Sequence, residues 1–187
     1  MVDVRIADWA GFEAVMGEKG GCGGCWCMLW RLTRREMDAG MGAHNRAAMK
    51  TIFEAGPPPG LIAYDGSRPI GWIQIDARSA FPRLGTSRVL KPVDDEVVWS
   101  VSCFLVDKAY RRKGVSRALL EGACDLARDR GAEWLEGYPI DTPKTSYPPV
   151  YAFTGFLGTF RDAGFQEIAR RSATRPIMRR RLSAPRD

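Results

Sequence analysis

Residues 101–120 read VSCFLVDKAYRRKGVSRALL, and this stretch decides the fold. Its first six residues are apolar apart from Ser102, which predicts a buried strand. A basic turn that contains Gly114 follows. Beyond the turn, apolar or small residues recur at helical spacing and form one face: Val115, Ala118, Leu119, Gly122, Ala123, Leu126 and Ala127. The stretch therefore predicts a strand that enters an amphipathic helix through a basic, glycine-containing turn.

The composition of this turn predicts an anion-binding site. The first N–H groups of a helix have no partner within it, and the helix dipole adds about half a positive charge there. Gly114 has no Cβ to keep a phosphate away from the backbone. Four cations surround it: Arg111, Arg112, Lys113 and Arg117. The spacing matches neither a Walker loop nor a Gly-x-Gly-x-x-Gly turn. An ordinary basic helix start is the alternative interpretation.

The rest of the chain alternates between helical and strand patterns. Helical periodicity and capping signals mark four segments: 8–17, 33–56, 111–130 and 153–163. Strand patterns, including a hairpin around Asp-Gly-Ser, mark six segments: 61–64, 70–75, 97–106, 133–138, 166–169 and 177–182. No repeat or linker divides them. We expect one α/β domain over residues 1–187, built around a mixed sheet flanked by helices.

The composition excludes several classes of protein. The 187 residues carry a net charge of +6, with 27% charged and 10% aromatic residues, which excludes a disordered chain. No apolar run reaches the roughly 18 residues of a membrane span. Asp3 and Asp8 argue against a signal peptide. Three arginines at 179–181 have no nucleic-acid-binding motif beside them, so we expect neither a nucleic-acid nor a membrane partner. We expect a cytoplasmic protein, either a monomer or a homodimer.

The five cysteines fall into two groups. Cys103 and Cys124 stand singly in apolar segments and are expected to be buried as small hydrophobic residues. Cys22, Cys25 and Cys27 lie together in the stretch GGCGGCWCM. Three interpretations stay open for them: a flexible loop with incidental or substrate-lining thiols, redox chemistry, or a soft-metal site. We assign no metal, because a fourth ligand is hard to find in a chain with a single histidine.

The central stretch resembles the acyl-CoA motif of the GNAT superfamily of acetyl-CoA-dependent N-acetyltransferases. That motif is Arg/Gln-x-x-Gly-x-Gly/Ala after a strand, and this chain has RRKGVS at 111–116 after FLV at 104–106. Ser116 departs from the motif but is small enough for the same close approach. By element order the resemblance extends over about residues 61–182, whereas residues 1–60 match only in being helical.

The resemblance implies acetyl-CoA as co-substrate, an amine acceptor, and a GNAT-like fold with a largely antiparallel central sheet. Backbone amides of residues 112–117 would hold the pyrophosphate. Phe104 and Val106 would pair their backbone with the pantetheine arm, and the acetyl carbonyl would lie near Val106 for direct attack by the amine. Residues 61–182 would form the CoA-binding core, and residues 1–60 would help to form the acceptor cleft. The implied CoA-binding residues are Phe104, Leu105, Val106, Arg111, Arg112, Lys113, Gly114, Val115, Ser116 and Arg117.

The general acid is where the sequence departs from the family pattern. Many relatives have a tyrosine five positions before the Phe of Gly-Phe, and that position here is Phe160, which cannot donate a proton. Tyr151 and Tyr147 lie just upstream and are the candidate substitutes. In the alternative interpretation both tyrosines only line the cleft, and water protonates the thiolate.

A base must also accept a proton from the attacking amine. Glu96, just before the strand at 97–106, is the first candidate. Ser100 or Ser102 could instead orient a water molecule, whereas residues 94–95 are expected in a solvated turn.

Three hypotheses about function follow. The first is an acetyl-CoA-dependent N-acetyltransferase that acts on a small amine. The second is an acyltransferase that takes its acyl group from the phosphopantetheine of an acidic acyl carrier protein, which Arg111, Arg112 and Lys113 would contact. The third is a non-catalytic acyl-CoA-binding module, which Phe160 in place of tyrosine suggests.

Overall fold

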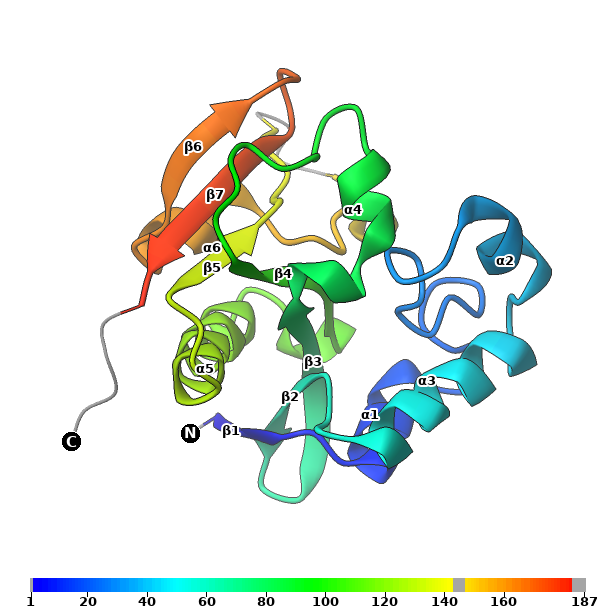
Figure 1. Ribbon diagram of the computed structural model, residues 1–187. Helices are drawn as coiled ribbons and strands as arrows, with labels where there is room; N and C mark the ends of the chain where they lie inside the picture. The colour runs from blue at the N-terminus through cyan, green and yellow to red at the C-terminus, as the bar shows by residue number, and fades with distance from the viewer. Residues whose placement is uncertain (1, 143–146, 183–187) are drawn as a thin grey trace.

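One mixed sheet organises the molecule, and a computed structural model describes residues 2–142 and 147–182. The strands in these residues are β1 (Asp3–Ile6), β2 (Gly60–Asp65), β3 (Arg68–Ala77), β4 (Val98–Val106), β5 (Trp134–Gly137), β6 (Gln166–Arg170) and β7 (Pro176–Arg181). They pair in the order β1-β2-β3-β4-β5-β7-β6 (Figure 1). Only β4 and β5 pair in parallel among these strands. The expected α/β domain with a largely antiparallel mixed sheet is confirmed.

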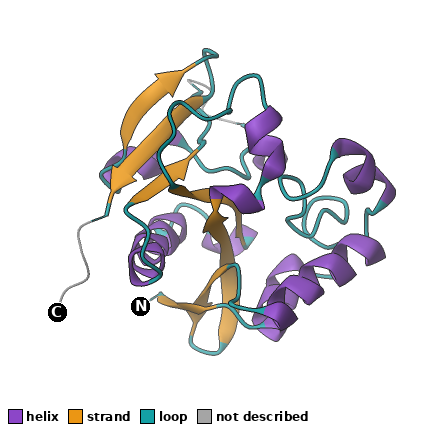
Figure 2. Cartoon of the chain, viewed as in Figure 1, coloured by secondary structure: helices purple, strands orange, loops and turns teal. Residues whose placement is uncertain are grey.

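Helices cover both faces of this sheet (Figure 2). The helices of the described residues are α1 (Trp9–Met16), α2 (Arg34–Ala39), α3 (Ala43–Ala55), α4 (Pro82–Thr86), α5 (Val115–Asp129) and α6 (Leu157–Asp162). Three short 3-10 turns join them: η1 (Arg78–Ala80), η2 (Lys108–Tyr110) and η3 (Pro149–Tyr151). In the described part of the chain, none of these helices combines the length and apolarity that crossing a membrane requires.

The predicted apolar face of α5 packs on one side of the sheet. Leu119, Leu120 and Ala123 are fully buried there against apolar residues of β2, β3 and β4. Gly122 lets this helix approach β1 closely, because a Cβ at that position would lie 2.9 Å from a methyl group of Val4. The helix with the cleanest predicted face is therefore the one that carries the main core.

The opposite side of the sheet is covered by α1, α3 and the loop between α1 and α2. Trp72 of β3 is fully buried at its centre, with Phe12 of α1 packed against the indole ring at 4.7 Å between centroids. Trp26 and Met49 complete the same apolar cluster. The tryptophans of this face thus serve mainly as core.

The structure corrects three sequence predictions. The helix expected over 33–56 starts at the predicted capping box of Thr33 and Glu36 but is broken into α2 and α3, since Gly42 has a φ of 87°. The helix expected over 153–163 is shorter, because Gly155 has a φ of 84° and Phe156 is extended. The N-terminal part is not only helical, because β1 adds an edge strand to the sheet.

Candidate active site

The sheet opens between β4 and β5. Their parallel pairing ends at Val101 opposite Gly137, and β4 continues beyond that pair. At the same level Ser102 is an extra residue in β4, because the β3–β4 register slips there. A bulge and the end of parallel pairing therefore coincide. We call the opening between residues 102–106 and 138–140 the fork.

A later segment of the chain lies inside the fork. The Phe104 N–H, on the free edge of β4, donates to the Phe153 carbonyl at 2.5 Å. On the other side, the Ile140 N–H donates to the Gly155 carbonyl at 2.8 Å. Residues 153–155 thus bridge the two diverging strands and occupy the hydrogen-bonding edge that β4 would otherwise offer to a ligand.

The basic turn lies between the C-terminal end of β4 and the start of α5. Gly114 caps the helix with a φ of 78°, and no described side chain caps its first turn. A Cβ at Gly114 would have no protein atom within 4 Å, so the space beside the turn is open. Arg111, Arg112 and Lys113 are exposed around it, and the Arg111 Nε also donates to the Val106 carbonyl at 3.3 Å. Free N–H groups, open space and positive charge together suit a phosphate group.

A series of buried polar side chains lies next to the fork, where β4 and β5 are still paired. The hydroxyls of Ser100 and Tyr138 are hydrogen-bonded at 2.8 Å, and Tyr138 donates to the Glu136 carboxylate at 2.8 Å. Glu136 is fully buried and pairs with Arg78 and with Arg179, the latter at 2.7 Å. Burial and the negative charge of Glu136 raise the pKa of Tyr138 well above its usual value. Tyr138 is therefore a neutral hydroxyl at pH 7.

A second polar group ties the bulge to the N-terminal loop. The side chains of Ser102 and Gln74 are hydrogen-bonded at 2.7 Å. With its amide nitrogen toward Ser102, Gln74 also donates to the Cys27 carbonyl at 3.0 Å and accepts from the Arg31 Nε at 3.1 Å. Arg31 in turn pairs with Asp76 at 2.7 Å. The bulge is thus held by hydrogen bonds on the face covered by the N-terminal helices.

Comparison with known protein families agrees with this geometry. The model of the acetyltransferase (GNAT) family matches residues 26–141. The chain belongs to the GNAT family. No curated protein matches it significantly.

Solved structures of GNAT proteins share the fold at low sequence identity. An N-acetyltransferase from Staphylococcus aureus Mu50 is 12% identical, with coverage of 98% of this chain and 99% of that chain and a TM-score of 0.58. A GCN5-related N-acetyltransferase from Kribbella flavida is 17% identical, with coverage of 97% and 98% and a TM-score of 0.57. PaiA N-acetyltransferase from Thermoplasma acidophilum, solved in complex with coenzyme A, is 11% identical, with coverage of 97% and 99% and a TM-score of 0.55.

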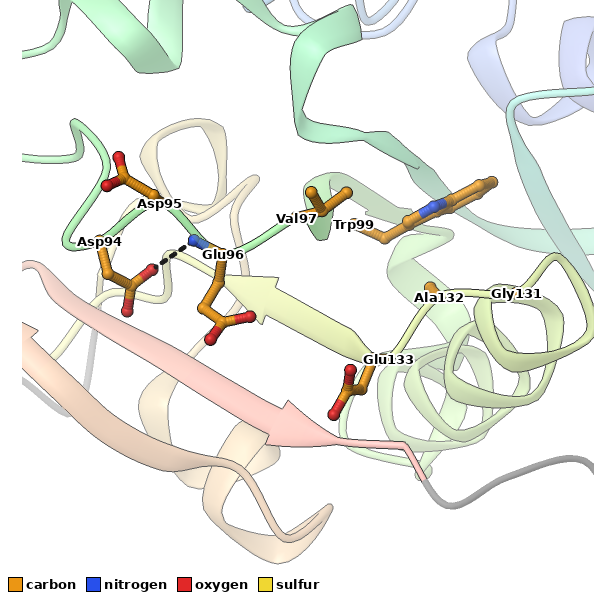
Figure 3. A pocket seen from close by; sticks show the side chains of 8 residues that line it. All are labelled: Asp94, Asp95, Glu96, Val97, Trp99, Gly131, Ala132 and Glu133. Atoms are coloured by element: carbon orange, nitrogen blue, oxygen red, sulfur yellow. Dashed lines mark hydrogen bonds between the residues drawn. The ribbon is translucent and has the colours of Figure 1, made fainter.

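The GNAT fold places the predicted catalytic base at the far end of β4 from the basic turn. Glu96 is exposed and lines a cavity of about 580 Å³ with Trp99, Glu133 and other residues (Figure 3). Glu96 lies two residues before β4, and the strand from Val98 to Ser102 alone spans about 13 Å. A base at this position would have to act on the fork through a chain of water molecules.

The tyrosines predicted as acids lie on the segment that leads into the fork. Tyr151 is 60% exposed, two residues before Phe153. Tyr147 is half-buried and contacts the ring of Phe156 edge-on. Phe160, at the position of the family tyrosine, is fully buried and contacts the rings of Phe104 and Phe165. The structure therefore provides no hydroxyl at position 160.

Sequence reasoning missed Tyr138 and Glu136, a buried polar pair at the fork. The signal in the sequence is the Glu136 carboxylate between Leu135 and Gly137, because a carboxylate in a buried strand requires a buried partner. Its partner Arg179 belongs to the run of three arginines at 179–181. Arg179 is in fact 7% exposed, because β7 is an interior strand of the sheet.

The GNAT chain brings Cys103 to the N-terminal cysteine loop. The sulfur of Cys27 lies 3.2 Å from that of Cys103, and both residues are buried. Cys22 is exposed and Cys25 is partly buried. No group of three or more His, Cys, Asp or Glu side chains within the described residues is arranged to hold a metal ion.

Proposed function

We propose that this GNAT protein transfers an acetyl or other short acyl group from acyl-CoA to a small amine. The observation that carries the proposal is the uncapped, basic turn of residues 111–117 beside the fork. A pyrophosphate group fits this turn, because open space lies beside Gly114 and the N–H groups of Val115, Ser116 and Arg117 head the helix. These backbone amides would hold the pyrophosphate of CoA, with Arg111, Arg112 and Lys113 adding positive charge.

The free edge of β4 would hold the pantetheine arm through Phe104, Leu105 and Val106. The bound thioester would supply an activated acyl group, and a backbone N–H on this edge would polarise its carbonyl. The Phe104 N–H donates to Phe153 in the structure, so residues 153–155 must move before this group can serve. Once that segment has moved, the Phe104 N–H would be available to the pantetheine arm, whereas the acyl carbonyl would lie near Val106.

Proton transfer at the fork requires a base for the amine and an acid for the thiolate. We retain Glu96 as the candidate base, acting through water, and Tyr151 and Tyr147 as the candidate acids. Tyr151 is supported by its place two residues before Phe153. The Ser100–Tyr138 hydrogen bond offers a second route, in which Ser100 orients the water that accepts the amine proton.

Direct binding of CoA tests the proposal with two matched variants. Gly114→Glu places a carboxylate beside the first turn of α5, and we expect CoA affinity to fall at least tenfold. Gly131→Glu is the control, because Gly131 lies past the other end of α5 with a similar φ of 82° and equally open space. Isothermal titration of both variants measures the effect. Equal affinities for wild type and Gly114→Glu would refute the assigned site.

Turnover separates the three functional hypotheses. Release of free CoA from acetyl-CoA with a panel of amines supports the N-acetyltransferase. The exposed cations Arg111, Arg112 and Lys113 favour an acidic acyl carrier protein as the second candidate donor, and an acyl-loaded carrier that competes with CoA would support it. Tight CoA binding without transfer to any amine would support the non-catalytic module.

A further inference from the structure

Two thiols from distant parts of the chain are in direct contact. The sulfur atoms of Cys27 and Cys103 are hydrogen-bonded at 3.2 Å. Cys27 is 4% and Cys103 is 8% exposed. A disulfide needs the two sulfur atoms at about 2.05 Å, so they would have to approach by little more than 1 Å.

The backbone on the Cys27 side is held in an unusual conformation. Trp26 and Cys27 have φ values of 45° and 56°, in the left-handed region that side chains disfavour. Such strain persists only where the surroundings fix it. Here the Trp26 N–H donates to the Gly20 carbonyl at 3.1 Å, and the Cys27 carbonyl accepts from Gln74. The strained residues are the ones that present the Cys27 thiol to β4.

The loop before Cys27 is rich in glycine. Five of its glycines have positive φ values: Gly17, Gly20, Gly21, Gly23 and Gly24. Exposure decreases along the loop from Cys22 through Cys25 to Cys27. Opening this glycine-rich segment would admit a small molecule to the buried thiol pair without unfolding the sheet.

We propose that Cys27 and Cys103 form a redox pair that closes to a disulfide when hydrogen peroxide is the oxidant. One thiolate attacks the peroxide and becomes a sulfenic acid, with release of one water molecule. The second thiol then attacks that sulfur, an S–S bond forms, and a second water molecule leaves. The two thiols together lose two electrons and two protons, and the peroxide is reduced to two molecules of water.

The surroundings of the thiols set the rate of this reaction. The hydrogen-bonded Cys27 sulfur and burial raise the pKa of Cys103 well above its usual value. Burial raises the pKa of Cys25 to about 11. Because the thiolate is the reactive form, oxidation is slow while the loop is closed. A competing disulfide between Cys22 and Cys25 has the right spacing, but the structure places the shortest sulfur contact of the described residues at Cys27 and Cys103.

The disulfide would restrict the proposed active site. It would join the N-terminal loop to the residue of β4 that directly precedes Phe104. The effect on catalysis rests on the proposed function, whereas formation of the cross-link does not. If neither the reduced nor the oxidised protein transfers an acyl group, the proposed function fails while the redox pair stands.

Peptide mapping tests the proposal on the full chain. Reduced protein is treated with hydrogen peroxide under native conditions, alkylated in denaturant and digested with trypsin. Cys27 falls in the peptide of residues 20–31 and Cys103 in that of residues 89–108. We expect a cross-link between these two peptides that dithiothreitol removes. A double variant, Cys22→Ser with Cys25→Ser, keeps the pair and should retain the cross-link, whereas Cys27→Ser should lose it.

Several results would overturn the redox pair. These are a disulfide confined to the peptide of residues 20–31, conversion of Cys27 or Cys103 to sulfinic acid without a cross-link, or alkylation of both residues after Cys22 has been oxidised. Circular dichroism monitors the fold of each variant. If Cys27→Ser does not fold, the wild type and the double variant still test the proposal. A disulfide within the loop cannot form in the double variant, because Cys27 is its only remaining loop cysteine.

Discussion

Replacing the buried carboxylate of Glu136 is expected to lower the free energy of unfolding. This carboxylate accepts from the Arg179 Nη2 at 2.7 Å, from the Arg179 Nε at 3.0 Å and from the Tyr138 hydroxyl at 2.8 Å, and it also pairs with Arg78. Replacing one partner of a buried ion pair costs about 3–5 kcal/mol, because the other charge stays buried. We expect Glu136→Gln to cost about 3 kcal/mol, since Arg179 keeps its pair with Asp94 and glutamine keeps one acceptor oxygen.

Glu133→Gln is the matched control for this variant. Glu133 precedes β5 and pairs with Arg181 of β7 at 2.8 Å, but both side chains are more than half exposed. An exposed pair is worth less than about 1 kcal/mol. Urea unfolding followed by circular dichroism measures both variants. With a slope of about 3 kcal/mol per M, the Glu136→Gln midpoint should fall by about 1 M. Midpoints of the two variants that agree within about 0.2 M would refute the reasoning.

Two further predictions concern the acid and the pH dependence of stability. Phe160→Tyr places a hydroxyl among buried rings, and we expect the free energy of unfolding to fall by about 1–3 kcal/mol with no gain in transfer rate. A variant with a higher transfer rate would show that position 160 does reach the thiolate. The hydrogen bond from Arg179 lowers the pKa of Asp94, so the folded state favours the carboxylate. That stability is present above the unfolded pKa of about 3.9 and is lost as the pH falls through the lower folded value. Asp94→Asn should therefore flatten the decline of the melting temperature below about pH 4, and a decline as steep as in wild type would contradict this account.

Features encoded by neighbouring residues could be predicted from the sequence. The helix predicted over 8–17 is present as α1, and Asp8 caps it by accepting from the Gly11 N–H at 2.7 Å. The basic turn at Gly114 lies directly between β4 and α5, because the strand, glycine and helix signals are contiguous. In both places the physical cause operates within one helical turn.

Features that depend on distant partners could not be predicted. The partner of Cys27 lies 76 residues away, and nothing near Cys103 marks it as more than a buried apolar residue. The fork depends on a register slip at Ser102, which leaves no compositional trace in an otherwise regular strand. Residues 153–155 fill that fork because of a hydrogen bond to Phe104 that only the folded chain creates.

The short parallel pairing of β4 with β5 affects how the sheet would respond to mechanical force. Within the described residues, four residue pairs, Val98–Trp134 to Val101–Gly137, form the strand pairing between β1–β4 and β5–β7–β6. A load applied across the sheet would concentrate on those pairs, because parallel pairing is slightly less stable per residue than the antiparallel pairing on either side. Under such a load, β4 and β5 would separate first. The β1–β4 part and the β5–β7–β6 part of the sheet would each keep their own strand pairing.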